Sequence, residues 1–67
     1  KKHGYPRTVK PVKINDGTII SPGSIITAGT VIGKNCIIGA GSVVSTEIPD
    51  NSVVLGNPAR VIKKIDL

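Results

Sequence analysis

Residues 32–43 read IGKNCIIGAGSV and decide the fold, because one pattern returns after six residues. Each six-residue unit opens with Ile-Gly and closes on a β-branched aliphatic residue. An α-helix repeats near 3.6 residues and a β-strand at 2, so neither alone gives a period of six. A period of six therefore indicates short strands separated by a regularly repeated turn.

The repeat extends in both directions and runs without a gap from Ile14. The units are INDGTI, ISPGSI, ITAGTV, IGKNCI and IGAGSV, and Val44 begins a sixth. The fourth position is Gly in four units and Asn in one, and these residues tolerate a positive φ. The fifth position is Thr, Ser or Cys, and the sixth is Ile or Val. We therefore expect the backbone to turn once per unit.

Side chains alternate along the strand between two turns. If the first position points inward, the fifth also points inward and the sixth points outward. Three units would close one triangular coil of 18 residues. The expected stacks are Ile14 on Ile32, Ile20 on Ile38, Ile26 on Val44, and Thr18 beneath Cys36. Cys36 is thus expected to fill a small inward slot, in preference to acting as a nucleophile.

The outward column is aliphatic throughout, with Ile19, Ile25, Val31, Ile37 and Val43 at the sixth positions. Monomers rarely expose an apolar surface of that size. A chain of 67 residues is also near the lower limit for independent folding, so oligomerisation would support it. Three flat walls suit a threefold ring, and the expected partner is therefore two further copies, in a homotrimer.

Composition excludes several classes of protein. One Cys and one His per chain allow no intrachain disulfide and no structural zinc site. Ile and Val dominate the apolar residues and favour strands. No apolar run reaches the roughly 20 residues that span a bilayer, and no signal peptide opens the chain. A cytoplasmic protein without membrane insertion is expected. The first residue is Lys, which indicates processing or a fragment of a longer protein.

The formal charge of +5 is concentrated in residues 1–13 and 60–64. Basic ends are typical of proteins that bind nucleic acid, a membrane surface or a small phosphorylated ligand. The alternative is that the lysines keep an Ile/Val scaffold soluble. Tyr5 is the only residue able to stack on a base, so nucleic-acid binding is not expected.

Repeat and tail together resemble the hexapeptide-repeat acyltransferases, in their maltose, galactoside and sugar O-acetyltransferase branch. The resemblance covers about residues 11–65, and its most specific segments are IPDNS at 48–52 and GNPAR at 56–60. It implies an all-β fold, a left-handed parallel β-helix with a short C-terminal tail. Handedness comes from the resemblance alone, because parallel crossovers are otherwise right-handed. The expected divisions are a lead-in (1–13), the β-helix (14–47) and a loop with a basic tail (48–67).

The resemblance also implies acetyl-CoA as co-substrate, in a groove between neighbouring subunits and without a metal. Ala40 and Gly41 would let the pantetheine arm approach the backbone, although a simple glycine-rich turn explains them equally well. Ser45 and Thr46 occupy groove-lining positions, and Thr46 stands where many relatives have lysine.

Two basic residues near the C-terminus complete the implied coenzyme site. Arg60 follows Asn-Pro-Ala and matches the family's basic residue at the nucleotide end of CoA, where a charge-assisted contact suits phosphate. Lys63 would add a second cation. The alternative is that RVIKKI is only a solvated basic tail.

The implied reaction is O-acetyl transfer to a sugar or a polysaccharide precursor, which needs a general base. In the family this base is a histidine upstream of the repeat, and His3 is the only candidate. His3 would alternatively be a frayed end. A second hypothesis is a non-catalytic trimeric β-helix, a truncated remnant that binds CoA without turnover. A zinc carbonic anhydrase of the same fold needs three histidines, which one His per chain does not supply.

Overall fold

The computed structural model describes residues 11–66, which form eight β-strands and no helix. None of these described residues lies in a helix long and apolar enough to cross a membrane. Six strands have two residues each and two are longer. They are β1 (Lys13–Ile14), β2 (Ile19–Ile20), β3 (Ile25–Ile26), β4 (Val31–Ile32), β5 (Ile37–Ile38), β6 (Val43–Val44), β7 (Ser52–Gly56) and β8 (Ala59–Lys64).

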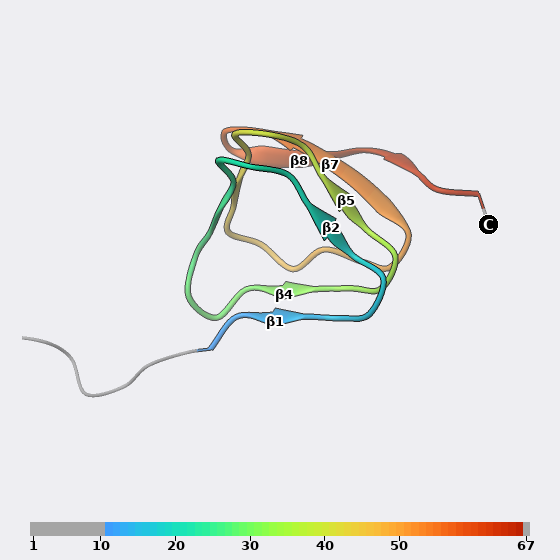
Figure 1. The fold of residues 1–67 in the computed structure, drawn as a ribbon, viewed down its shortest axis with the longest axis horizontal. Coiled ribbons are helices and arrows are strands. Elements are labelled where there is room, and N and C mark those ends of the chain that lie inside the picture. The colour runs from blue at the N-terminus through green and yellow to red at the C-terminus, as the bar shows by residue number, and fades with distance from the viewer. Residues whose placement is uncertain (1–10, 67) are drawn as a thin grey trace, which may run out of the picture.

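The strands build a three-sided coil, seen almost end-on in Figure 1. Face 1 holds β1 and β4, face 2 holds β2, β5, β7 and β8 in that order, and face 3 holds β3 and β6. All pairs are parallel except β7 with β8. The predicted fold class, a left-handed parallel β-helix of hexapeptide repeats, is confirmed.

Each corner is made by the fourth residue of a unit. Its φ is positive in all five units: 77° at Gly17, 77° at Gly23, 82° at Gly29, 56° at Asn35 and 70° at Gly41. This is the left-handed region, which Gly and Asn enter at least cost. The turn predicted once per unit is therefore confirmed, and the column of glycines is explained by backbone geometry.

The interior consists of the predicted aliphatic stacks. Ile14 is in register with Ile32, Ile20 with Ile38, and Ile26 with Val44. Ile32 and Ile38 are 0% exposed and Val44 is 1% exposed, whereas Ile14 is 43% exposed. The difference arises because β1, β2 and β3 are the outermost strands of their sheets among the described residues.

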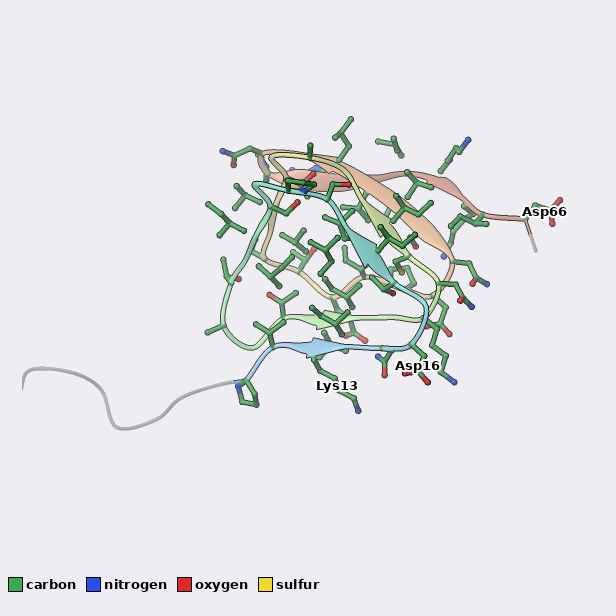
Figure 2. All side chains as sticks on the ribbon, in the orientation of Figure 1. Lys13, Asp16 and Asp66 are labelled. Carbon is green, nitrogen blue, oxygen red and sulfur yellow. The ribbon has the colours of Figure 1, made fainter. Side chains whose placement is uncertain are left out.

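Sixth-position side chains point outward as expected. Ile19 is 60% exposed, Ile25 57%, Val31 36% and Ile37 38%. The three faces nevertheless differ in polarity. Face 1 carries Lys13 in register with Val31, and Figure 2 shows the Lys13 side chain directed away from the coil. Faces 2 and 3 begin with Ile19 and Ile25 instead, so the apolar ladders are continuous only there.

The repeat continues beyond residue 47, where the sequence analysis ended it. Residues 48–53, IPDNSV, form a further complete unit. Asn51 has a φ of 60° at its fourth position, Ser52 is buried at its fifth, and Val54 begins the next unit. Ile48 lies in register with Ile32, and Val54 with Ile38.

The segment expected to be a loop with a basic tail therefore contains two strands. After β7 the chain reverses, and β8 runs antiparallel to β7 along the edge of face 2. The predicted division of the chain into domains at 1–13, 14–47 and 48–67 stays a prediction. His3 lies outside the described residues.

Candidate functional site

Ala40 and Gly41 lie at the corner between faces 2 and 3, and both are exposed. Gly41 donates its amide to the carbonyl of Pro22, one coil below, at 3.3 Å. A Cβ placed on Gly41 would have no atom within 4 Å, so the outer side of this corner is open. The site can therefore admit a ligand close to the backbone.

Strand β7 of the β7–β8 hairpin contacts the residues on either side of this corner, Gly39 and Ser42. Gly39 donates its amide to the Val54 carbonyl at 2.8 Å, and Gly56 donates to the Ser42 hydroxyl at 3.3 Å. A Cβ on Gly39 would collide with a methyl group of Leu55. A larger residue at position 39 would therefore make the exposed Leu55 side chain move away from this corner.

Arg60 stands on this hairpin, opposite Leu55 in the register of β7 and β8. Its side chain is exposed. Because Leu55 lies against Gly39, strand β7 stands between Arg60 and the corner that holds Ala40 and Gly41. The structure thus brings three of the predicted coenzyme residues to one corner of the prism.

Ser45 and Thr46 lie elsewhere, at the corner between faces 3 and 1. They connect β6 to Ile48, and both are exposed. Face 3, with the outward side chains of Ile25 and Val43, separates them from Ala40. In one copy of the chain these two groups of residues flank a face and do not converge.

Lys63 lies farther along β8, opposite Val53. Its neighbour Lys64 was not among the predicted site residues. The Nζ of Lys64 donates to the carbonyl of Asp50 at 2.9 Å and to the hydroxyl of Ser52 at 3.3 Å. Lys64 lies opposite Ser52, the small fifth residue of the unit 48–53. This contact could be predicted only if residues 48–53 were first identified as a repeat unit.

The buried polar side chains of the described part are all hydrogen-bonded. Every buried side-chain nitrogen or oxygen among residues 11–66 has a hydrogen-bond partner. Cys36 is 0% exposed, and its Sγ donates to the Pro49 carbonyl at 3.2 Å. Its expected inward slot is confirmed. Across the same residues no three side chains of His, Cys, Asp or Glu cluster as metal ligands.

Comparison with known proteins decides the family. Residues 11–46 match the family model described as bacterial transferase hexapeptide (six repeats). The chain belongs to this hexapeptide family. A curated family member from Shouchella clausii (strain KSM-K16), a 2,3,4,5-tetrahydropyridine-2,6-dicarboxylate N-acetyltransferase, is 57% identical over 61 residues.

Solved structures of hexapeptide acetyltransferases superpose well. A maltose O-acetyltransferase from Clostridium difficile 630 is 59% identical, with a TM-score of 0.84 over 87% of this chain. A galactoside acetyltransferase in complex with coenzyme A is 42% identical, with a TM-score of 0.83 over 85% of this chain. A Vibrio cholerae O1 biovar eltor hexapeptide-repeat acetyltransferase, complexed with acetyl coenzyme A, is 33% identical, with a TM-score of 0.83 over 87%.

The chain spans only part of each hexapeptide relative. The match with the curated Shouchella clausii protein includes 91% of this chain but only 25% of that protein. The chain covers 31% of the maltose enzyme, 28% of the galactoside enzyme and 32% of the Vibrio cholerae protein. The predicted family is confirmed, and the relatives that match this segment are acetyltransferases.

Proposed function

We propose that the chain forms the coenzyme-binding end of an acetyltransferase that uses acetyl-CoA and acetylates a sugar or a polysaccharide precursor. The observation that carries this proposal is the pairing of Arg60 with Leu55, because Leu55 lies against Gly39, next to the open corner of Ala40 and Gly41. A guanidinium there would hold the phosphates of CoA while the pantetheine arm follows the corner along the prism. Charge-assisted contacts of this kind are the strong ones.

The residues at the corner suit the two parts of this donor. The pantetheine arm has amide groups and no charge, so it needs close backbone approach more than ionic contacts. Gly41 provides the approach, because its outer side is open. The nucleotide end carries phosphates, and β8 offers Arg60 and Lys63. One matching structure in complex with acetyl coenzyme A and one in complex with coenzyme A support acetyl-CoA as the donor.

We propose a homotrimer with the donor between subunits. The support is the pair of outward apolar ladders on faces 2 and 3, where Ile19, Ile25 and Ile37 are 60%, 57% and 38% exposed. A threefold ring of prisms would cover these ladders. It would also let Ser45 and Thr46 of one copy approach Ala40 of the next, which the geometry of one copy does not allow. Cytoplasmic location is part of the same proposal.

Acyl transfer also needs a base. The attacking sugar hydroxyl must lose its proton as its oxygen bonds to the acetyl carbon, and the sulfur of CoA must leave as a thiolate that is then protonated. Residues 11–66 include no histidine. His3 remains the proposed base, and a sugar acceptor is supported by the maltose and galactoside relatives.

Thiol release from acetyl-CoA with a panel of sugars tests the proposal. The expected result is release of CoA that depends on a sugar and is lost in His3→Gln, while CoA still binds. Binding with no turnover for any acceptor would favour the non-catalytic β-helix. Absence of any CoA binding would remove the acetyltransferase assignment for this segment.

A further inference from the structure

Arg60 and Lys63 point to the same side of β8, although they are three residues apart. On a regular strand such residues point to opposite sides. Here Arg60 pairs with Leu55 and Lys63 with Val53, and these two partners are two residues apart on β7. Residues that face each other across a ladder share a side. The register shift between Val53 and Val54 absorbs the additional residue, Ile62, as a β-bulge.

That common side is the outside of face 2. Val53 is also in register with Ile37, an outward sixth-position residue that is 38% exposed. Lys63 therefore continues the outward column. Lys64 pairs with the buried Ser52 and points the other way, where its Nζ bonds to Ser52 and to the Asp50 carbonyl. Adjacent lysines thus have different surroundings.

A second register is available to the same sequence. Without the bulge, Ile62 would face Val53, and Lys63 would face Ser52 and the Asp50 carbonyl. The turn between Gly56 and Ala59 fixes the register of the first residues of β8, but the bulge separates these from Lys63 and Lys64. Beyond the bulge, a backbone bond from the Ile65 amide to the Asn51 carbonyl, at 2.7 Å, also belongs to the observed register. In the observed register Lys64 donates to the Asp50 carbonyl and the Ser52 hydroxyl, and Lys63 lies on the outer side of β8.

We propose that Lys64 is a positioning residue: it occupies the acceptors of Asp50 and Ser52 and so keeps Lys63 on the outer side of β8 beside Arg60. The inference rests on the proposed function, because the outer cations are those offered to the phosphates of CoA. Two residues of strand separate their attachment points by about 7 Å. That spacing lets the guanidinium and the ammonium hold two phosphate groups of one ligand, such as the two of a diphosphate.

A double-mutant cycle with CoA separates positioning from simple attraction by a basic tail. Lys63→Met removes the outer lysine directly. Lys64→Met is expected to draw Lys63 to Asp50 and Ser52, which removes the same outer cation. Each single variant should therefore weaken CoA binding about fivefold, and the double variant should weaken it no more than about fivefold. Lys64→Arg should restore the affinity.

Pantetheine, which lacks all the phosphates, serves as the control ligand. Its affinity should be equal in the unaltered chain and in every variant, whereas a loss of folding would weaken both ligands together. Unchanged CoA binding in Lys64→Met would overturn the proposal. So would single effects that multiply to about 25-fold in the double variant, because two independent cations would then act.

A measurement without ligand keeps the positioning claim independent of the coenzyme. In nuclear Overhauser spectra, the cross-strand neighbour of Val53 should be Lys63 in the unaltered chain and Ile62 in Lys64→Met. Persistence of the Val53 to Lys63 contact in that variant would show that Lys64 does not set the register. If the unaltered chain binds no CoA, the proposed function fails, and these spectra still decide the role of Lys64.

Discussion

Thr18 and Cys36 lie one coil apart, and the Cys36 amide donates a hydrogen bond of 3.1 Å to the Thr18 hydroxyl. The same hydroxyl donates to the Gly33 carbonyl at 2.7 Å. A fifth-position side chain therefore does more than fill space, because its oxygen ties the backbone of the next coil to its own. Cys36, Ser42 and Ser52, farther along this column, are 0% exposed.

Replacing Cys36 tests how tightly this column is packed. Cys36→Leu should destabilise the protein by about 1 to 3 kcal/mol, because the buried slot must expand. Cys36→Ser should cost less, since a hydroxyl retains a donor for the Pro49 carbonyl. Urea unfolding of both variants measures the difference. Equal stabilities would show that the slot is loosely packed.

Gly33 is required for a different reason from the corner glycines. A Cβ on Gly33 would lie 2.6 Å from the backbone nitrogen of Asp50 and 2.9 Å from its Cα, so the coils must separate. Gly33→Ala should cost several kcal/mol, on the order of 3. Gly23 has a φ of 77° but no atom closer than 3.8 Å to such a Cβ. Gly23→Ala should therefore cost only about 1 kcal/mol. Thermal unfolding that ranks the pair in reverse would contradict the coil contacts.

The aliphatic stack should weaken unevenly along the prism. Ile32 is 0% exposed, so Ile32→Ala should cost about 2 to 5 kcal/mol. Ile14 is 43% exposed at the end of the same stack, and Ile14→Ala should cost about 1 kcal/mol. Denaturant unfolding compares them. Similar losses for both would contradict the difference in burial between the two residues.

The outward apolar ladders of faces 2 and 3 are expected to form the interface between copies of the chain. A lysine at Ile25 or Ile37 would place a charge within a buried apolar contact, so Ile25→Lys and Ile37→Lys are expected to give smaller or insoluble species. Glu47→Lys is the control, because this exposed position already carries a charge. Light scattering reports the mass. An unchanged trimer mass in both isoleucine variants would place the contact elsewhere.

The periodic part of the fold was predictable from sequence because each column has one physical cause. The fourth residue has a positive φ, which favours Gly or, at position 35, Asn. The first residue stacks in the interior and is Ile or Val, and the fifth also points inward and is small. Every inward pair follows once the period is known. The register of β1 with β4, β2 with β5, and β3 with β6 is therefore as predicted.

The unit 48–53 was not predicted, because the period of six is interrupted just before it. The unit that opens at Val44 has four residues before Ile48, so the frame shifts and IPDNSV no longer falls on it. Asn51 is the residue that could have indicated the shifted repeat, because it occupies the same corner position as Asn35. The bulge at Ile62 has no local signature of this kind, because it depends on the pairing of β8 with β7.

The candidate site is predictable only in part for the same reason. Residue types at the corner, such as Gly41, follow from the repeat, but the position of Arg60 depends on a hairpin that the period does not encode. In the proposed trimer, contacts between Ser45 or Thr46 and the coenzyme would need a second copy. These assignments therefore stay predictions.

Titration of CoA into the chain and into Arg60→Ala is the most direct measurement of the central claim, that this β-helix ends in a hairpin that holds the phosphates of the donor. We expect the unaltered chain to bind CoA and Arg60→Ala to bind it more weakly by about 1.5 to 3 kcal/mol, with pantetheine unaffected. An identical dissociation constant for CoA in the two proteins would contradict the claim.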